Sequence, residues 1–108
     1  MSEICGSVKV TNDNLNEIVS SNPYVLVDFF AKWSGPCKTL SKAIDEVGKE
    51  TGVTVAWCDV DECKDLTAEL KIDGVPAVCL FKGGEQIYKA IGLITKSQIE
   101  NLVIKNKG

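Results

Sequence analysis

Histidine is absent from the 108-residue sequence, and its absence removes several kinds of catalytic site. No Ser-His or Cys-His pair is available for nucleophilic catalysis, and no imidazole is available as a metal ligand. No apolar run approaches the roughly 20 residues that a membrane-spanning helix needs. The formal net charge is -3 without a basic cluster, which argues against nucleic acid or an anionic membrane as the main partner.

A secretory signal is also missing, because the first ten residues lack a basic segment followed by an apolar one. We therefore expect a soluble cytoplasmic protein. The five cysteines are an odd number, which disfavours a disulfide framework and predicts thiols that stay reduced in a cytosol. With 44% apolar residues, the chain has enough material for one compact domain over residues 1–108.

The densest apolar run lies in Tyr24–Lys38, which reads YVLVDFFAKWSGPCK. The run is too continuous for a sheet that is exposed on one face, so we predict a strand over Tyr24–Ala31 that is covered on both faces. Pro36 lies just inside a following amphipathic segment and marks a helix start. That helix should end near Thr51-Gly52. The stretch thus predicts a strand, a short turn and a helix, where open α/β sheets usually bind their ligands.

The rest of the chain predicts the element order β-α-β-α-β-α-β-β-α, with residues 106–108 fraying at the end. Before the central strand we expect a strand at 7–11 and a helix that runs from a cap at Thr11 or Asn12 to about Ser20. After the central helix we expect a strand Val53–Val60, and then a helix that is capped by Asp61 and has Gly74 past its end. The chain should close with a strand Val75–Lys82 that has Pro76 among its first residues, a two-residue turn at Gly83-Gly84, a strand Glu85–Ile91, and a last helix that begins with the capping box Thr95-Lys96-Ser97-Gln98.

Two interpretations fit Ser34-Gly35-Pro36-Cys37. Ser34 is a good helix cap, whose hydroxyl would accept the backbone N–H of Cys37, so an ordinary helix start explains the motif. Alternatively, a thiol in the first helical turn feels the positive helix end, which favours the thiolate and nucleophilic or redox chemistry. These four residues leave both interpretations open.

Asp28 favours the chemical interpretation. It stands between Val27 and Phe29 in the predicted buried strand, where an ionised carboxylate is costly. We expect burial to raise its pKa, which would suit a group that exchanges a proton with a nearby thiol. The alternative is a solvated carboxylate at the strand end, but three apolar residues follow Asp28 before Lys32.

Four segments, VDFFAKWSGPCK, DVDEC, DGVPAVCLFKGGE and IGLITKSQIENL, resemble the thioredoxin family in their order and spacing over nearly the whole chain. The likeness is to the cytosolic eukaryotic kind. It implies the α/β thioredoxin fold, a central mixed five-stranded sheet flanked by four helices. It also implies that the family's activity is thiol-disulfide exchange on protein disulfides in cell redox homeostasis.

The resemblance assigns roles to individual residues. Ser34 occupies the position of the attacking Cys, Cys37 that of the resolving Cys, and Asp28 that of the buried proton acceptor. Val75-Pro76 matches the segment with a cis-proline, and Gly92 matches the glycine that leaves room for substrate. The implied substrate-binding residues are Trp33, Gly35, Pro36, Val75, Pro76, Gly92 and Leu93.

The resemblance also implies partners. Electrons would come from NADPH through thioredoxin reductase, with no cofactor bound to this chain and no metal. Targets would be proteins that contain disulfides. We expect a monomer, with a dimer linked by a disulfide between surface thiols as the alternative.

Four positions depart from the family pattern. Ser34 replaces the Cys of Cys-Gly-Pro-Cys, and since a hydroxyl forms no disulfide we expect this chain to be inactive as a dithiol reductase. Either engineering or natural divergence accounts for Ser34. Lys42 replaces a Pro that kinks the helix in the family, and Ala77 replaces a common Thr. Trp57 replaces a charged neighbour of Asp28, and this replacement would leave the Asp28 carboxylate in less polar surroundings.

The alternative function is a non-catalytic module that binds proteins.

The other cysteines are predicted to be structural or peripheral. Cys58 and Cys79 lie in apolar strands and should be small core residues. Cys63 resembles an extra, oxidisable Cys of animal thioredoxins, and Cys5 lies in the N-terminal segment. A zinc site built on Cys58 and Cys63 is disfavoured, because the spacing is loose.

Overall fold

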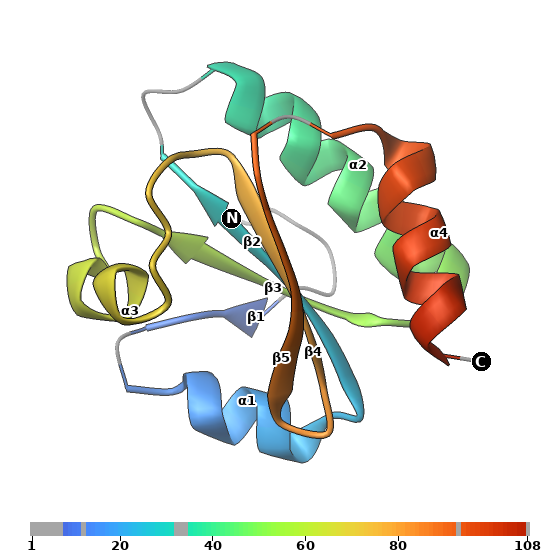
Figure 1. Ribbon diagram of the computed structural model, residues 1–108, viewed down its shortest axis with the longest axis horizontal. Coiled ribbons are helices and arrows are strands. Elements are labelled where there is room, and N and C mark those ends of the chain that lie inside the picture. Colours follow the sequence, from blue (N-terminus) through green and yellow to red (C-terminus); the bar gives the residue numbers. More distant parts are fainter. Residues whose placement is uncertain (1–7, 12, 32–34, 93, 108) are drawn as a thin grey trace.

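Over residues 8–11, 13–31, 35–92 and 94–107, which the computed structural model describes, the chain folds into a five-stranded sheet with helices on both faces (Figure 1). At residues 35–39, 41 and 107 only the backbone is described. The predicted element order is confirmed. The elements are β1 (Val8–Lys9), α1 (Leu15–Ser21), β2 (Tyr24–Phe30), α2 (Gly35–Thr51), β3 (Thr54–Asp59), α3 (Lys64–Glu69), β4 (Ala77–Lys82), β5 (Glu85–Ile91) and α4 (Lys96–Lys107).

The sheet is mixed, as predicted, and its strand order is β1-β3-β2-β4-β5. Strands β1, β3 and β2 run parallel, while β4 is antiparallel to both β2 and β5. Strand β2 therefore has a neighbour on each side and helices over each face, which explains its continuous apolar run. Several strands are shorter than predicted: β2 ends at Phe30, β3 begins at Thr54, and β4 begins at Ala77.

The two faces of the sheet have separate cores, and alternate residues of β2 contribute to each. Val25, Val27 and Phe29 pack with the face that α1 and α3 cover. Leu26 packs with the opposite face, under α2 and α4. Helices α2 and α4 each direct an apolar stripe at this second core, which contains Leu40, Ile44, Val47, Ile99 and Val103. At roughly 25 cal/mol per Å² of buried apolar surface, these two layers supply most of the folding energy.

Helix α2 packs closely against β3 at Gly48. A Cβ atom built on Gly48 would lie 2.5 Å from Cγ2 of Val55. Although Gly costs a helix interior about 1 kcal/mol relative to Ala, overpacking costs about 1–3 kcal/mol. We expect Gly48→Ala to lower the free energy of unfolding by about 1 kcal/mol, measured by urea denaturation. A stability equal to or above that of the native chain would show that the α2–β3 contact gives way easily.

The hairpin and the last helix begin as predicted. Gly83 and Gly84 have φ angles of 61° and 87°, the left-handed values that a two-residue hairpin turn requires. At the start of α4, the Thr95 hydroxyl accepts the N–H of Gln98 at 3.1 Å. The side chain of Gln98 in turn accepts the N–H of Thr95 at 2.9 Å. This reciprocal pair is the predicted capping box.

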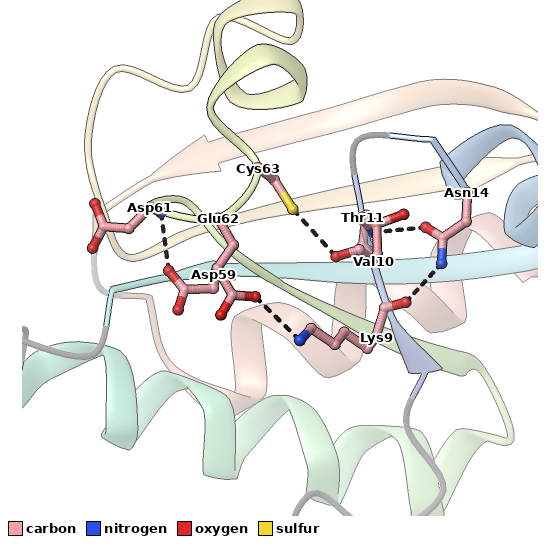
Figure 2. A network of polar contacts seen from close by, with 8 residues as sticks. All are labelled: Lys9, Val10, Thr11, Asn14, Asp59, Asp61, Glu62 and Cys63. Carbon is pink, nitrogen blue, oxygen red and sulfur yellow. Dashed lines mark hydrogen bonds and ion pairs between the residues drawn. The ribbon is translucent and has the colours of Figure 1, made fainter.

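The predicted cap of the first helix was wrong. Helix α1 begins at Leu15, after Asn14, and Asn12 lies outside the described residues. The Thr11 hydroxyl accepts the N–H of Asp13 at 3.3 Å, while the Asn14 side chain accepts the N–H of Thr11 at 2.7 Å and donates to the Lys9 carbonyl at 2.9 Å (Figure 2). These side chains bond to the backbone of the β1–α1 connection itself, so the helix begins later in the sequence than predicted.

The predicted cap of the third helix was also wrong. Asp61 lies in the turn before α3, where its N–H donates to Oδ1 of Asp59 at 2.9 Å (Figure 2). The carbonyl of Asp59 accepts the N–H groups of Glu62 and Cys63 at 3.0 and 2.9 Å. Because the buried Asp59 organises this turn, α3 begins only at Lys64, and Cys63 is the residue before it.

Of the last two helices, one ends as predicted and one does not. Helix α3 ends at Glu69, so Gly74 lies past its end as predicted, and Lys71, with a φ of 58°, takes the left-handed conformation that follows the helix. Lys89 of β5 donates to the carbonyls of Leu70 and Lys71, at 3.5 and 3.1 Å, which holds this end in place. Helix α4 continues through Lys107 rather than fraying at 106. Within the described ranges, no helix is long and apolar enough to cross a membrane.

Candidate functional site

The strand and the helix predicted on either side of the β2–α2 junction are confirmed, while residues 32–34 between them lie outside the described residues. Strand β2 ends at Phe30 and α2 begins at Gly35. The backbone of Pro36 and Cys37 is therefore in the first turn of α2, the positive end of its dipole. Trp33 and Ser34 lie outside the described residues, so the expected Ser34 cap stays a prediction. In place of the Pro that kinks related helices, Lys42 lies on the exposed side of an unbroken α2.

Asp28 is buried, as predicted, with 1% of its surface exposed. It alternates with Leu26 along β2 and therefore faces α2. Its partner on β3 is Trp57, and its partner on β4 is Val78. Because Asp28 lies two residues before the end of β2, it is near the end of the strand that leads into α2. Asp28 thus lies in the sheet on the face that α2 covers, near the strand end that leads to that helix.

The surroundings of Trp57 add a residue that the sequence did not indicate. Lys9 of β1 is paired with Trp57, and its Nζ lies 5.6 Å from the centroid of a Trp57 ring. Phe30 packs on Trp57 with ring centroids 5.6 Å apart, and Lys9 forms an ion pair with Glu62 at 3.1 Å. One row across the sheet is therefore Lys9, Trp57, Asp28. The cationic side chain of Lys9 thus lies across Trp57 from Asp28.

The segment at Val75-Pro76 and the residue Gly92 lie side by side. The Val75-Pro76 peptide bond is cis, which confirms a sharp expectation of the resemblance. The N–H of Gly92 donates to the Pro76 carbonyl at 2.7 Å. Gly92 has a φ of 107°, and a Cβ atom built on it would meet no heavy atom of the described residues within 4 Å. Among the described residues, space is thus open beside Gly92. Leu93 lies outside the described residues.

Strand register brings these segments to one edge of the sheet. Phe29 is paired with Ala77, and Ala77 with Ile91. The residue before Ala77 is Pro76 and the residue after Ile91 is Gly92. Since β4 is antiparallel to both neighbours, Pro76 and Gly92 lie just beyond the end of β2 that leads into α2 (Figure 1). Three segments far apart in sequence therefore meet where the chemistry was predicted.

An open depression of about 410 Å³ lies beside Val75. Most of its lining could not be predicted from the sequence, because these residues come from helix α3 and from the connections before and after it, whose proximity only the fold reveals. Its walls combine apolar side chains with one exposed carboxylate, a surface suited to an extended peptide. The lining residues are Val60, Thr67, Ile72, Asp73, Gly74 and Val75.

Gly92 offers a test of the backbone at this edge. A φ of 107° is a conformation that residues with a Cβ rarely adopt, and the cost is of order 1–3 kcal/mol. We expect Gly92→Ala to lower the free energy of unfolding by about this amount in urea denaturation, through backbone strain rather than a clash. An unchanged unfolding midpoint would mean that this backbone relaxes without cost.

The described side chains contain no group of three or more His, Cys, Asp or Glu placed to hold a metal ion. Cys58 and Cys79 are fully buried core residues, as predicted, and burial raises the pKa of Cys79 to about 12. Cys63 is buried as well. Cys5 lies outside the described residues.

Comparisons with known proteins agree with this arrangement. The thioredoxin family model matches residues 6–105. A thioredoxin of Rickettsia felis is 40% identical over 92 residues, covering 83% of this chain and 88% of the relative. A thioredoxin of Mycoplasmoides gallisepticum is 35% identical over 96 residues, covering 87% and 96%. Among solved structures, a mutant thioredoxin from Halobacterium salinarum superimposes with a TM-score of 0.89 at 31% identity, covering 97% of this chain and 94% of that one. The chain belongs to the thioredoxin family, whose members are thiol-disulfide oxidoreductases.

Proposed function

We propose that this chain keeps the substrate groove and the resolving half of a thioredoxin site but lacks the group that attacks a target disulfide. The observation that carries the proposal is Ser34 in the sequence, one residue before α2 begins. The end of β2, four residues before Ser34 in the sequence, lies at the same edge of the sheet as Pro76 and Gly92. The proposed site therefore has a hydroxyl at the position where exchange chemistry needs a thiol.

Disulfide reduction by this fold needs two sulfurs. In the complete reaction, a thiolate at position 34 attacks one target sulfur, forms a mixed disulfide and releases the other sulfur as a thiolate. The Cys37 thiolate then attacks the mixed disulfide, so that the protein is oxidised and the target gains two electrons. The hydroxyl of Ser34 ionises far less readily and forms no disulfide, so the first step does not occur and the native chain does not turn over.

Asp28 serves the second step. It accepts the proton of Cys37 as that thiol becomes a nucleophile, and returns it when the disulfide is reduced. This role is supported by the position of Asp28, which is buried on the face of the sheet that α2 covers and lies near the end of β2 that leads into α2. We assign Asp28 and Cys37 these roles together, because neither has a use in exchange without the other.

The target lies extended across the groove. Its backbone pairs with that of Val75 as an added strand, while Trp33, Gly35, Pro36, Pro76, Gly92 and Leu93 make the remaining contacts. The open space at Gly92 and the depression beside Val75 support this placement. Binding of this kind needs no sulfur at position 34 and therefore persists in the native chain.

A form of the protein with both thiols would receive electrons from NADPH through thioredoxin reductase, with no cofactor bound to the chain itself. We place the protein in the cytoplasm as a monomer, with a disulfide-linked dimer as the alternative state. The native chain, mixed with NADPH, thioredoxin reductase and insulin, should reduce insulin no faster than the mixture without it. Turnover by the native chain would overturn the proposal.

The second candidate function is a binding module that recognises proteins through the same groove without any exchange, and Ser34 is the observation that favours it. An intermediate case is a one-thiol exchanger, in which Cys37 reacts with glutathione or with a partner protein. Labelled glutathione disulfide distinguishes the two, because only the exchanger acquires a glutathione adduct on Cys37. The codon for residue 34 in the source gene distinguishes an engineered Ser from a natural one.

A further inference from the structure

Two thiols that the proposed exchange chemistry does not use lie together in the core. Cys58, near the end of β3, is fully buried, and Cys63, just before α3, is 2% exposed. Both belong to the cluster that packs under α1 and α3, on the face of the sheet opposite α2. Although Cys58 pairs with Phe29 near the end of β2, the two thiols lie on the opposite face of the sheet from α2, and the proposed oxidation does not use Ser34.

The turn between the two residues returns the chain toward β3. The Asp59 carbonyl accepts the N–H groups of Glu62 and Cys63, which closes the turn at 3.0 and 2.9 Å. The Cys63 thiol donates to the Val10 carbonyl at 3.2 Å, so its sulfur points into the core rather than toward solvent (Figure 2). Val10 in turn donates its N–H to the carbonyl of Trp57, the residue before Cys58, at 2.8 Å. The Cys63 sulfur therefore lies in the same part of the core as Cys58.

We propose that Cys58 and Cys63 form an intramolecular disulfide when the folded chain is oxidised by a peroxide. One thiol attacks the peroxide oxygen, becomes a sulfenic acid and releases water from hydrogen peroxide. The second sulfur then attacks the sulfenic sulfur, the S–S bond forms, and a second water leaves. Two thiols thus lose two electrons and two protons, and one peroxide is reduced to two waters.

The environment of the pair sets the order and speed of these steps. Burial, followed by the effect of the neighbouring Cys63 thiol, raises the pKa of Cys58 well above its ordinary value, so this thiol keeps its proton. We therefore expect Cys63 to react first and Cys58 to resolve the sulfenic acid. Because both sulfurs are buried, oxidation waits for a local opening of the turn and is slower than oxidation of an exposed thiol.

Formation of the disulfide would change the neighbouring contacts. The hydrogen bond from Cys63 to the Val10 carbonyl would be lost, since the sulfur no longer carries a proton. The turn would also be closed covalently, and it contains Val60, which lines the depression beside Val75. We therefore expect oxidation of this pair to change the shape of the depression beside Val75.

Peptide mapping tests the proposal, because trypsin leaves Cys58 and Cys63 in one peptide, residues 50–64, and every other Cys in a different one. The full-length native chain is treated with hydrogen peroxide under folding conditions, unfolded, blocked with N-ethylmaleimide and digested. We expect peptide 50–64 to carry no label and to be about 2 Da lighter than its reduced form. A peptide that keeps two labels while the peptides of Cys5 or Cys37 are oxidised would overturn the proposal. So would a single sulfinic or sulfonic acid on either residue.

Two variants serve as controls. Cys79→Ser removes a thiol that is equally buried but lies on β4, and it should leave the loss of about 2 Da unchanged. Cys63→Ser keeps a donor for the Val10 carbonyl and should abolish the loss. Repeating the treatment in urea shows whether folding matters: a disulfide that forms only in the unfolded chain would contradict the juxtaposition inferred from the structure.

Discussion

Ser34→Cys should convert the chain into a protein-disulfide reductase. With NADPH, thioredoxin reductase and insulin, we expect the variant to reduce insulin at least about 100-fold faster than the native chain. The gain should be large because removal of a covalent nucleophile can cost an enzyme on the order of 10⁶ in turnover. The assay background, rather than the chemistry, limits the measurable ratio. The substitution exchanges an oxygen for a sulfur and leaves the fold in place.

Ser34→Ala is the matched control for this gain. It removes the hydroxyl without adding a thiol, so it should match the native chain in the insulin assay and lose only the helix cap that Ser34 is predicted to supply. Such a cap is worth about 1 kcal/mol. If both the native chain and Ser34→Cys fail to reduce insulin, the reductase proposal is wrong and the binding-module function gains support.

Asp28→Asn in the Ser34→Cys background should slow insulin reduction by about 10-fold or more, since a positioned proton acceptor typically contributes 10²–10⁴-fold. Asn has nearly the shape of Asp but cannot take the proton of Cys37. The loss should be greatest near neutral pH and should shrink as pH rises, because the thiol then loses its proton without help. The measurement is the pH profile of turnover for the two proteins.

Asp59→Asn provides the comparison. Asp59 is the other buried carboxylate among the described residues, and it lies at the end of the strand next to Asp28. Its side chain accepts the N–H of Asp61 and supports a turn, so its substitution should reduce stability without changing the pH profile. Equal pH profiles for the Asp28→Asn and Ser34→Cys proteins would remove Asp28 from the proposed mechanism.

The sequence predicted best those elements whose signals are local. The φ angles of Gly83 and Gly84 suit a turn that few other residue types form, so the hairpin could be predicted to the residue. The capping box at Thr95 and Gln98 is equally self-contained. By contrast, the caps expected at Thr11 and Asp61 failed because several polar residues competed for the same backbone groups. The buried Asp59 decided the start of α3, and its burial depends on the tertiary fold.

The site was predictable where one strand carries the information. Asp28 could be identified because a single acid interrupts an apolar run, and burial of that run was expected from its continuity. Lys9 could not be identified, since its place over Trp57 depends on β1 pairing with β3. The depression beside Val75 was missed for the same reason. The placement of Cys58 and Cys63 in one core cluster was missed too, because it requires the turn that Asp59 organises.

The central claim is that position 34 is the attacking position of an otherwise complete site. The most direct test is to trap the covalent intermediate that an attack from position 34 would form. The double variant Ser34→Cys with Cys37→Ser is mixed with a peptide that carries an activated disulfide, and the product is mapped by mass spectrometry. Without a resolving thiol, the mixed disulfide should persist, and tryptic peptide 33–38 should gain the mass of the target peptide. Cys37→Ser alone should give no adduct there. Absence of the adduct from peptide 33–38 in the double variant would contradict the account.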